Sequence, residues 1–281
     1  MTNRLSVASG GRAARRDLAE FEGILSFKPS DGRLYSLHCR VGVLAMAFKL
    51  DGRYPTIASP WGDYAVYSFP DASKIGCSDR QPIMDAMNSI IAINWKAIEP
   101  HWTASSSPFD SKYSLILVYD RVELIAFSVY RVMTIAHRMA IYRSGTEVLP
   151  AYQGRGLYGF FTSQILKHPC AASHSERLLY GWRTRNPIVW AANAKICEMV
   201  APSLLADEAD ADLQAACIEM CATLYPGKPL EVPGMIMRGA YGHIEHIRQD
   251  YRGTASLVEA AMSRIIPNSA DALFSVGYAR V

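Results

Sequence analysis

A short glycine-containing loop holds the residues of this chain whose types and spacing could bind a phosphate group. A strand-like apolar run ends there, helical spacing begins directly after it, and the segment reads Val148-Leu149-Pro150-Ala151-Tyr152-Gln153-Gly154-Arg155-Gly156-Leu157-Tyr158-Gly159. Glycine lets the backbone approach a ligand closely, and the first N–H groups of a helix have no partner inside it. The helix dipole favours an anion at that end, and Arg155 adds a positive charge. The loop is therefore predicted to bind the phosphates of a cofactor.

One interpretation of the loop is a dinucleotide site, because Gly154-x-Gly156-x-x-Gly159 has the required spacing. Dinucleotide folds also need parallel βαβ units and an acidic residue after the second strand. Glu176 lies at about the right distance, but it precedes the next apolar strand. The strand-like segments before the loop have connectors too short for a crossover helix, so they are predicted to be antiparallel. An NAD(P)-dependent oxidoreductase and a glycine turn without a ligand remain as alternatives.

Taken from Gln153, the loop resembles the acyl-coenzyme A loop of the GNAT superfamily of N-acetyltransferases. The family pattern is Gln/Arg-x-x-Gly-x-Gly/Ala, usually preceded by Val-x-Pro-x-Tyr. The residues in register with it are Val148, Pro150, Tyr152, Gln153, Gly154 and Gly156. Tyr158 departs from the last small position, where it would crowd a pyrophosphate unless its ring turns away. Asn186 resembles the family's Asn that opens the helix after the fifth strand.

This resemblance implies an α/β (α+β) fold with a mixed, mostly antiparallel central sheet, flanking helices and an N-terminal extension. It also implies that the strands on either side of the loop splay apart and hold acetyl-CoA or another acyl-CoA in the gap. Val148 and Leu149 would bind the pantetheine arm through their main chain, and 154–158 would bind the pyrophosphate. The cofactor-binding residues implied are Val148, Leu149, Gln153, Gly154, Arg155, Gly156, Leu157, Tyr158 and Asn186.

The reaction implied is acyl transfer from a thioester to an amine. The amine must first lose a proton, because an alkylammonium ion with a pKa near ~10.4 is not a nucleophile. Glu147, beside the implied thioester position, is predicted to be the general base. The alternative is a strand carboxylate that faces solvent or an Arg, and Glu123 and His137 are further candidates for the base.

The sequence defines the oxyanion donor and the general acid less clearly than the general base. A backbone N–H near Leu149 is a candidate oxyanion donor. The family's Tyr, seven residues after its Asn, commonly protonates the departing thiolate, but Asn193 stands at that position and cannot act as an acid. Tyr158, Tyr152 or water would have to replace it, so the general acid stays open.

The elements that must position these residues follow from apolar periodicity. Strands are predicted at 64–69, 115–119, 123–132, 139–149, 178–182, 235–241 and 272–278, and helices at 83–98, 155–168, 189–200, 211–224 and 256–266. A strand-rich segment is expected within 21–50, and His243-Ile244-Glu245-His246 is interpreted as loop, since its spacing matches no helical zinc motif. The predicted organisation is an N-terminal extension over 1–60 and a GNAT-like domain over 61–281, with an insertion near 202–232.

The composition limits the classes of binding partner and the cellular compartment that we expect for this protein. The 281 residues carry a net charge of +3, too small to imply a polyanion, so no nucleic acid is expected. No apolar stretch is long enough to span a membrane and no signal segment opens the chain, so a cytoplasmic protein without a membrane is predicted. The six cysteines have no metal spacing, so no metal is expected, and Cys217 and Cys221 are predicted to be reduced core residues. The acidic run at 207–212 is interpreted as a helix start, with attraction of a cationic acceptor as the alternative.

The sequence therefore predicts an acyl-CoA-dependent N-acyltransferase, with acetyl as the first choice of acyl group and a small-molecule amine as the acceptor. A homodimer, a longer acyl chain and an acyl carrier protein as the donor remain open. The alternative from another class is a non-catalytic GNAT-like module that binds acyl-CoA as a sensor or scaffold. Tyr158 and Asn193, which depart from the family pattern, favour that alternative.

Overall fold

The computed structural model describes residues 22–27, 35–40, 50, 52–97, 99–169, 177–205, 210–241, 244–246 and 254–280. The chain divides into two compact units, Met1–Leu44 and Ala45–Val281. In the first unit, β1 (Glu22–Phe27) pairs antiparallel with β2 (Tyr35–Arg40), in agreement with the strand-rich segment predicted there. All that follows concerns the second unit.

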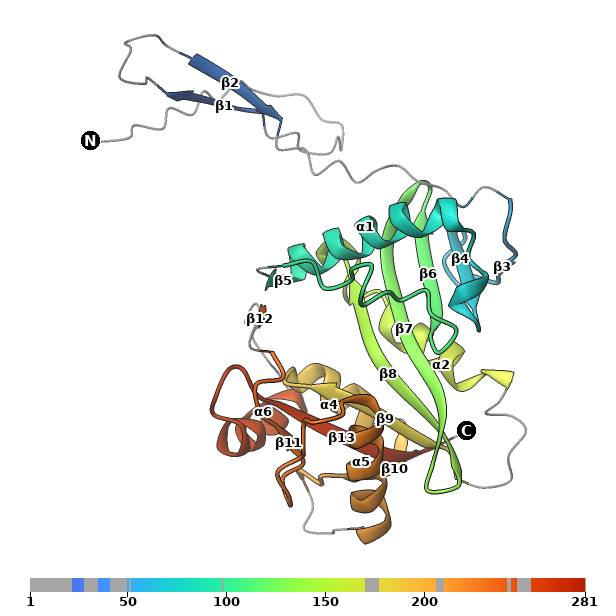
Figure 1. The fold of residues 1–281 in the computed structure, drawn as a ribbon, viewed down its shortest axis with the longest axis vertical. Coiled ribbons are helices and arrows are strands. Elements are labelled where there is room, and N and C mark those ends of the chain that lie inside the picture. Colours follow the sequence, from blue (N-terminus) through green and yellow to red (C-terminus); the bar gives the residue numbers. More distant parts are fainter. Residues whose placement is uncertain are drawn as a thin grey trace. The chain divides into compact units, whose positions relative to one another are not determined.

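A nine-stranded mixed sheet is the centre of the second unit (Figure 1). Its order is β10-β13-β9-β8-β7-β6-β4-β3, and β11 also pairs with β13. The strands are β3 (Thr56–Ile57), β4 (Tyr64–Phe69), β6 (Ser114–Asp120), β7 (Glu123–Ile135), β8 (Arg138–Val148), β9 (Leu179–Thr184), β10 (Cys197–Ala201), β11 (Ile236–Met237) and β13 (Ala272–Ala279). Among the pairings of described strands, only β8 with β9 is parallel. The predicted mixed, mostly antiparallel sheet is confirmed, and β6, β7 and β8 leave no βαβ unit before the loop.

Helices cover both faces of this sheet. On one face pack α1 (Cys77–Asn94) and α5 (Ala211–Leu224), and on the other α2 (Leu157–Leu166), α4 (Pro187–Ala194) and α6 (Thr254–Ile265). β6 shows why a continuous apolar run forms a strand here: Leu115 and Leu117 pack with α1, whereas Ile116 packs in the cluster that contains α2. A strand buried on both faces needs no polar alternation. We name the two sides the α1–α5 face and the α2–α4 face.

Several predicted boundaries are wrong for reasons of tertiary pairing. The helix predicted over 189–200 ends at Ala194, because Cys197–Ala201 pairs with the edge of β13 instead. The strand predicted over 235–241 is restricted to Ile236–Met237, since a turn follows directly. Residues 244–246, interpreted as loop, form β12 (Ile244–His246), whose backbone pairs with β5 (Trp95–Ala97). Partner strands that are distant in sequence decide each of these outcomes.

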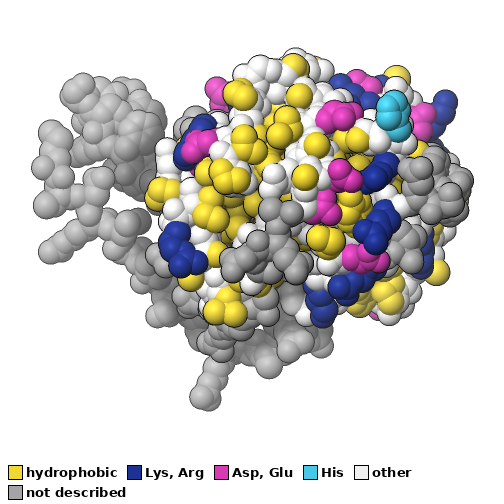
Figure 2. Space-filling model, turned by 90° about the horizontal axis from the view of Figure 1, so that it is seen from below, with side chains coloured by type: hydrophobic (Ala, Val, Ile, Leu, Met, Phe, Trp, Pro, Cys, Tyr) yellow, Lys and Arg dark blue, Asp and Glu magenta, His cyan; other side chains and the backbone are white. Residues whose placement is uncertain are grey.

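The features predicted for α5 are confirmed in the described residues. The Asp210 side chain accepts a hydrogen bond from Leu213 N at 2.9 Å, as expected for a carboxylate that caps a helix. Cys217 and Cys221 are buried free thiols on the side of α5 that packs on the sheet. None of the helices in the described residues combines the length and the apolar character that crossing a bilayer requires. Figure 2 shows a face on which basic and acidic side chains are interspersed, in keeping with the small net charge of +3.

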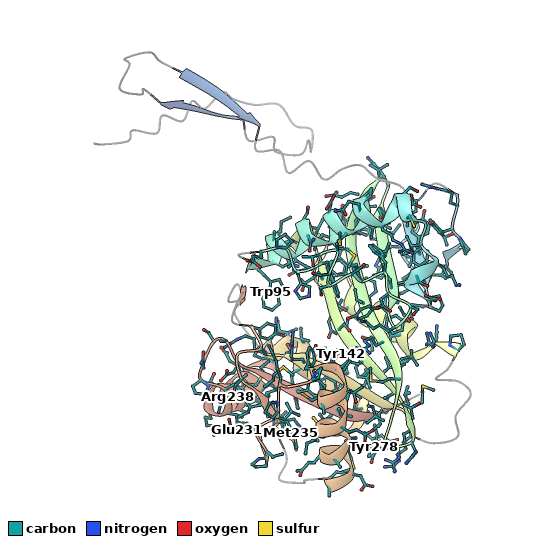
Figure 3. The ribbon with its side chains drawn as sticks, viewed as in Figure 1. Trp95, Tyr142, Glu231, Met235, Arg238 and Tyr278 are labelled. Atoms are coloured by element: carbon teal, nitrogen blue, oxygen red, sulfur yellow. The ribbon has the colours of Figure 1, made fainter. Side chains whose placement is uncertain are left out.

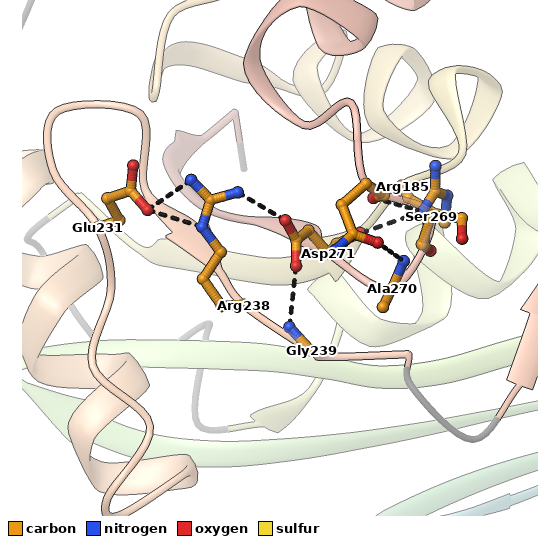
Figure 4. Close-up of polar contacts among 8 residues, drawn as sticks. Arg185, Glu231, Arg238, Gly239, Ser269, Ala270 and Asp271 are labelled. Carbon is orange, nitrogen blue, oxygen red and sulfur yellow. Dashed lines mark hydrogen bonds and ion pairs between the residues drawn. The ribbon is translucent and has the colours of Figure 1, made fainter.

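A buried carboxylate fastens the turn after β11 to the start of β13 (Figure 4). Asp271, which is 1% exposed, accepts hydrogen bonds from Arg238 Nη1 at 2.6 Å and from Gly239 N at 2.9 Å. Arg238 also donates to Glu231, and Arg185 donates to the carbonyl oxygens of Asn268 and Ser269. Burial by itself raises the pKa of Asp271, but the donors outweigh it and hold that pKa below its ordinary value.

We therefore expect Asp271→Ala to lower the free energy of unfolding by about 1–3 kcal/mol, because Gly239 N–H loses its buried acceptor. Since the folded pKa is lowered, the stability due to ionised Asp271 is present above pH ~4 and is lost as the pH falls below it. Urea unfolding at pH 7 and at pH 3 measures both effects. Glu231→Gln changes an exposed partner and should cost less than ~1 kcal/mol; an equal loss in both variants would contradict this account.

Candidate active site

The parallel strands β8 and β9 separate where the glycine loop begins. They pair only from Ala140 with Leu179 to Arg143 with Trp182, and β8 then continues without β9 to Val148. A register shift between Val129 and Tyr130 of β7 leaves Ser144 as an extra residue of β8 at this point. Beyond Arg143, β8 has no partner on the side of β9, and the bulge lies where the pairing ends. We call the space beside this unpaired part of β8 the gap. The end of the pairing at this point agrees with the splayed strands that the resemblance implies.

Main-chain groups of β8 face this gap. Leu149 N donates to Ile125 O at 2.9 Å, so the N–H of Leu149 itself is bound to β7. Because hydrogen-bonded and non-hydrogen-bonded pairs alternate between antiparallel strands, Val148 and Thr146 direct their N–H and C=O groups toward the gap. The Val148 carbonyl accepts hydrogen bonds from the side chains of Gln153 and Asn94, both at 3.1 Å. Of the backbone N–H groups near Leu149, that of Val148 is therefore the candidate oxyanion donor.

The loop at the open end of the gap has the backbone of an anion site. Gly154 and Gly156 have φ of 75° and 85°, a left-handed conformation that favours glycine. An added Cβ at Gly154 would meet no atom within 4 Å, so open space lies beside the loop. The first hydrogen bond of α2 runs from Phe160 N to Gly156 O, which leaves the N–H groups of Leu157 and Tyr158 without intrahelical partners.

Aromatic residues of a different segment brace this loop. Trp61 Nε1 donates to the carbonyl of Arg155 at 3.2 Å, and the Arg155 guanidinium donates to the Tyr64 hydroxyl at 3.1 Å. Arg155 is exposed and pairs with no carboxylate in the described residues, so its charge is available to an anion. Leu157 is buried in the core and contributes its N–H, not its side chain. Together these residues fit the phosphates of a cofactor.

Tyr158 does not crowd the loop, because its ring turns into the α2–α4 face. Its hydroxyl donates to Asn193 Oδ1 at 3.1 Å, and the Arg143 guanidinium lies 3.7 Å from the centre of its ring. Burial raises the pKa of Tyr158, while Arg143 opposes that change. Tyr152, the other candidate acid, donates to Asp120 at 2.8 Å on a different strand. Of the two tyrosines, Tyr158 is the one bonded to Asn193, the residue at the position of the family's acid.

Arg143 is a buried cation at the base of the gap. It is 5% exposed and donates to Thr146, Thr162 and Asn193, and no described carboxylate pairs with it. Its Nη2 and the Nδ2 of Asn193 are buried and have no hydrogen-bond partner. Such unsatisfied donors are costly in a core and are typical of a site that a ligand completes.

Glu147 lies on the α1–α5 face and contacts the end of α1. Its two carboxylate oxygens accept hydrogen bonds from Trp95 Nε1 at 2.8 Å and from Asn94 Nδ2 at 2.7 Å. Burial raises the pKa of Glu147 to about 7, and the hydrogen bonds from Asn94 and Trp95 limit the rise. A carboxyl group with a pKa near neutrality is suited to take and release a proton. Arg143 is on the opposite face and makes no ion pair with Glu147 in the described residues, but its positive charge also lowers the pKa of that carboxyl group.

The remaining predicted residues are distant from these groups or have structural roles. Asn186 caps α4, where its side chain accepts from Ile188 N at 2.9 Å. His137 is exposed in the turn between β7 and β8, at the end of β8 opposite the loop. Burial raises the pKa of Glu123, which lies at the turn that joins β6 and β7. Neither His137 nor Glu123 meets the gap.

Sequence reasoning missed three residues of the site. Asn94 and Trp95 are at the end of α1, and Arg143 is in the middle of a strand. The only local signal was a charged residue in an otherwise apolar part of a strand, at Arg143, since buried charges are rare and mostly functional or paired. Asn94 and Trp95 carry no such signal.

Comparison with known proteins gives matches only among solved structures. No family model and no curated protein sequence matches the chain. An Arabidopsis thaliana NAA60 structure in complex with acetyl-CoA matches with 13% identity and a TM-score of 0.35, over 49% of this chain and 87% of that one. The ribosomal-protein-S18-alanine N-acetyltransferase from Escherichia coli matches with 13% identity and a TM-score of 0.39, over 78% of this chain and 96% of that one.

A third match is the GNAT domain of S. lividans PAT, with 14% identity and a TM-score of 0.37, over 51% of this chain and 85% of that one. These overlaps are with acetyltransferases, but TM-scores below 0.5 carry no weight for the activity of this chain. The features that bear on the function of this chain are the geometry of β8 and β9, the glycine loop and Glu147.

Proposed function

We propose that this chain is an acyl-CoA-dependent N-acyltransferase of the GNAT type, which transfers an acyl group to the amine of a small molecule. The observation that carries the proposal is the gap between β8 and β9, which has an anion-binding loop at its open end and Glu147 beside it. A dinucleotide site has no support from this topology, because the strands before the loop are antiparallel.

The residues around the gap fit an acyl-CoA. The N–H groups of Gly156, Leu157 and Tyr158, with Arg155, would hold the pyrophosphate. The main chain of Thr146 and Val148 would pair with the amide groups of the pantetheine arm in place of β9. Bound there, the cofactor supplies the acyl group as a thioester.

The chain would supply proton transfer and charge stabilisation. Glu147 takes a proton from the acceptor ammonium, directly or through water, and Trp95 and Asn94 keep its carboxylate oriented. The N–H of Val148 donates a hydrogen bond to the carbonyl oxygen under attack. The Tyr158 hydroxyl, which now donates to Asn193, would donate to the departing sulfur. Arg143, beside the Tyr158 ring, favours negative charge there.

A calorimetric titration with acetyl-CoA tests the cofactor class. We expect a dissociation constant in the micromolar range and competition by free coenzyme A. Thiol release with a panel of amines then distinguishes an enzyme from the sensor module, which would bind acetyl-CoA and release no thiol with any amine. Binding of NAD(P) together with no binding of coenzyme A would overturn the proposal. No binding of either would exclude acetyl-CoA as the ligand of this loop.

A further inference from the structure

A second site lies on the α1–α5 face, close to Glu147 but outside the groups that the proposed reaction uses. It is a cavity with a volume of about 110 Å³. Side chains from the loop after β5, from β7, β8 and β9 and from the end of α5 line it, among them Trp102, Tyr113, Arg131, Ser144, Arg183 and Tyr225. This volume suits a small charged group and not a whole cofactor.

The cavity has an excess of positive charge. Arg131 and Arg183 both line it, and none of its described lining residues is an Asp or a Glu. In the described part of the chain, no ion pair involves either arginine. Both guanidinium groups lie against aromatic rings instead, Arg131 at 5.6 Å from the centre of Tyr113 and Arg183 at 4.9 Å from that of Tyr225.

Hydrogen-bond donors are also unsatisfied there. Arg131 Nε and Trp102 Nε1 are buried atoms without a partner. Arg183 Nη1 lies 3.7 Å from the sulfur of Met237, a weak acceptor, and the guanidinium also hydrogen-bonds the side chain of Tyr241. Although burial disfavours its charge, the neighbouring tyrosine hydroxyls at 225, 241 and 142 keep the pKa of Arg183 above its ordinary value. Both arginines line one cavity, and Arg131 has a buried donor without a partner. An anion there would supply both the counter-charge and acceptors.

A chain of side-chain contacts links the cavity to Glu147. Trp95 donates to Glu147 at 2.8 Å, and its ring stacks on Tyr241 with the ring centres 5.5 Å apart. Tyr241 in turn lies 5.1 Å from the Arg183 guanidinium. Tyr142 of β8 pairs with Arg131 of β7, and Glu147 of β8 pairs with Phe127 of β7. Tyr142 therefore lies on the same α1–α5 face as Glu147. Figure 3 shows Trp95 at the end of α1 and Tyr142 on β8.

We propose that the cavity formed by Arg131 and Arg183 binds an anionic group of the acceptor, so that the acceptor is an amine that also carries a carboxylate or a phosphate. The proposal rests on the proposed function, because it assumes that Glu147 receives a proton from an amine. With its anionic group between the two arginines, such an acceptor has its amine on the side of Glu147. Small amino acids and phosphorylated amines have this chemistry, whereas the free N-terminus of a peptide has no adjacent anion.

Matched acceptors test the proposal. Initial rates of thiol release are compared for amino acids and their carboxamides, and for O-phosphoethanolamine and ethanolamine, with acetyl-CoA saturating. We expect the wild type to prefer the anionic member of at least one pair by tenfold or more in kcat/KM. The first pair reports a carboxylate site and the second a phosphate site. Equal rates within both pairs, or a preference for the neutral members, would overturn the proposal.

Arg131→Met and Arg183→Met should lower kcat/KM for the preferred anionic acceptor at least tenfold, mainly through KM. They should leave the neutral partner within threefold. Arg177→Met is the matched control, since Arg177 also lies over a tyrosine but is exposed and outside the cavity. Loss of rate with both acceptors in an arginine variant would assign that arginine a general structural role and contradict the proposal.

Two binding measurements separate this proposal from the proposed function. Both arginine variants should bind acetyl-CoA with wild-type affinity by calorimetry, which also shows that they are folded. Calorimetry with N-acetyl amino acids and their amides repeats the comparison without turnover. Wild-type protein that binds acetyl-CoA but binds acid and amide equally would disprove the anion site and leave the proposed function standing. Failure to bind acetyl-CoA at all would count against the proposed function.

Discussion

Replacing Glu147 by Gln is expected to lower kcat by about 10²- to 10⁴-fold, the usual contribution of a positioned general base. Gln keeps the size of the side chain but cannot take a proton from the acceptor amine. It also presents an NH₂ group to one of the two donors, Asn94 or Trp95, that now bind the carboxylate. Steady-state rates at saturating acetyl-CoA measure the effect, and calorimetry with acetyl-CoA should give unchanged affinity.

The pH profile distinguishes the base from a residue that merely packs. Because burial raises the pKa of Glu147 to about 7, kcat/KM should rise with pH as the carboxyl ionises and level off above about pH 7. Glu147→Gln should remove this limb of the profile. Trp95→Phe removes one donor to the ionised form, so the limb should move to higher pH while the ring at 95 is retained. A wild-type limb that persists in Glu147→Gln would assign the titration to another group.

Replacing Gly156 by Glu is expected to weaken acetyl-CoA binding at least 100-fold, or ~2.7 kcal/mol. The new carboxylate would lie at the N-terminus of α2, where the phosphates of the cofactor are proposed to bind. Repulsion between like charges and the bulk of the side chain act together. Calorimetric titration measures the loss, and retained affinity would show that this loop does not bind the phosphates.

Gly156→Gln is the control for this substitution. It imposes the same left-handed backbone strain, since φ is 85° at this position, and nearly the same bulk without the charge. Trp61 lies 4.0 Å from an added Cβ, which is an ordinary contact, so both variants should fold. We expect Gly156→Gln to bind acetyl-CoA more tightly than Gly156→Glu by tenfold or more. Equal affinities would attribute the loss to backbone strain and bulk, and not to the charge.

Local patterns in the sequence determine much of the fold. The apolar runs that predict β6 and β7, the tight turn between them and the helix over 211–224 all agree with the structure. The glycine loop also lies where a strand gives way to a helix, with both glycines at positive φ. These features depend on contacts between residues a few positions apart, so their signal is in the residues themselves.

Contacts between distant residues decided the rest. Asn94 and Trp95 reach Glu147 from more than 50 positions away in the sequence, so neither its hydrogen bonds nor its raised pKa has a local signal. The helix predicted through Val200 ends early, because the edge of β13 accepts a strand there. A backbone edge that needs a partner outweighs helical periodicity.

The residues of the candidate site are likewise determined in part by local sequence and in part by tertiary structure. The sequence alone predicted a phosphate-binding loop and a strand carboxylate next to it, because consecutive residues carry both signals. Three features of the site are visible only in the tertiary structure. The Tyr158 ring points away from the loop, and Leu149 N donates to a carbonyl of β7. Arg131 of β7 and Arg183 of β9 line the same cavity. Side chains on separate strands meet only after the strands have paired, and the register of that pairing is not written in either segment alone.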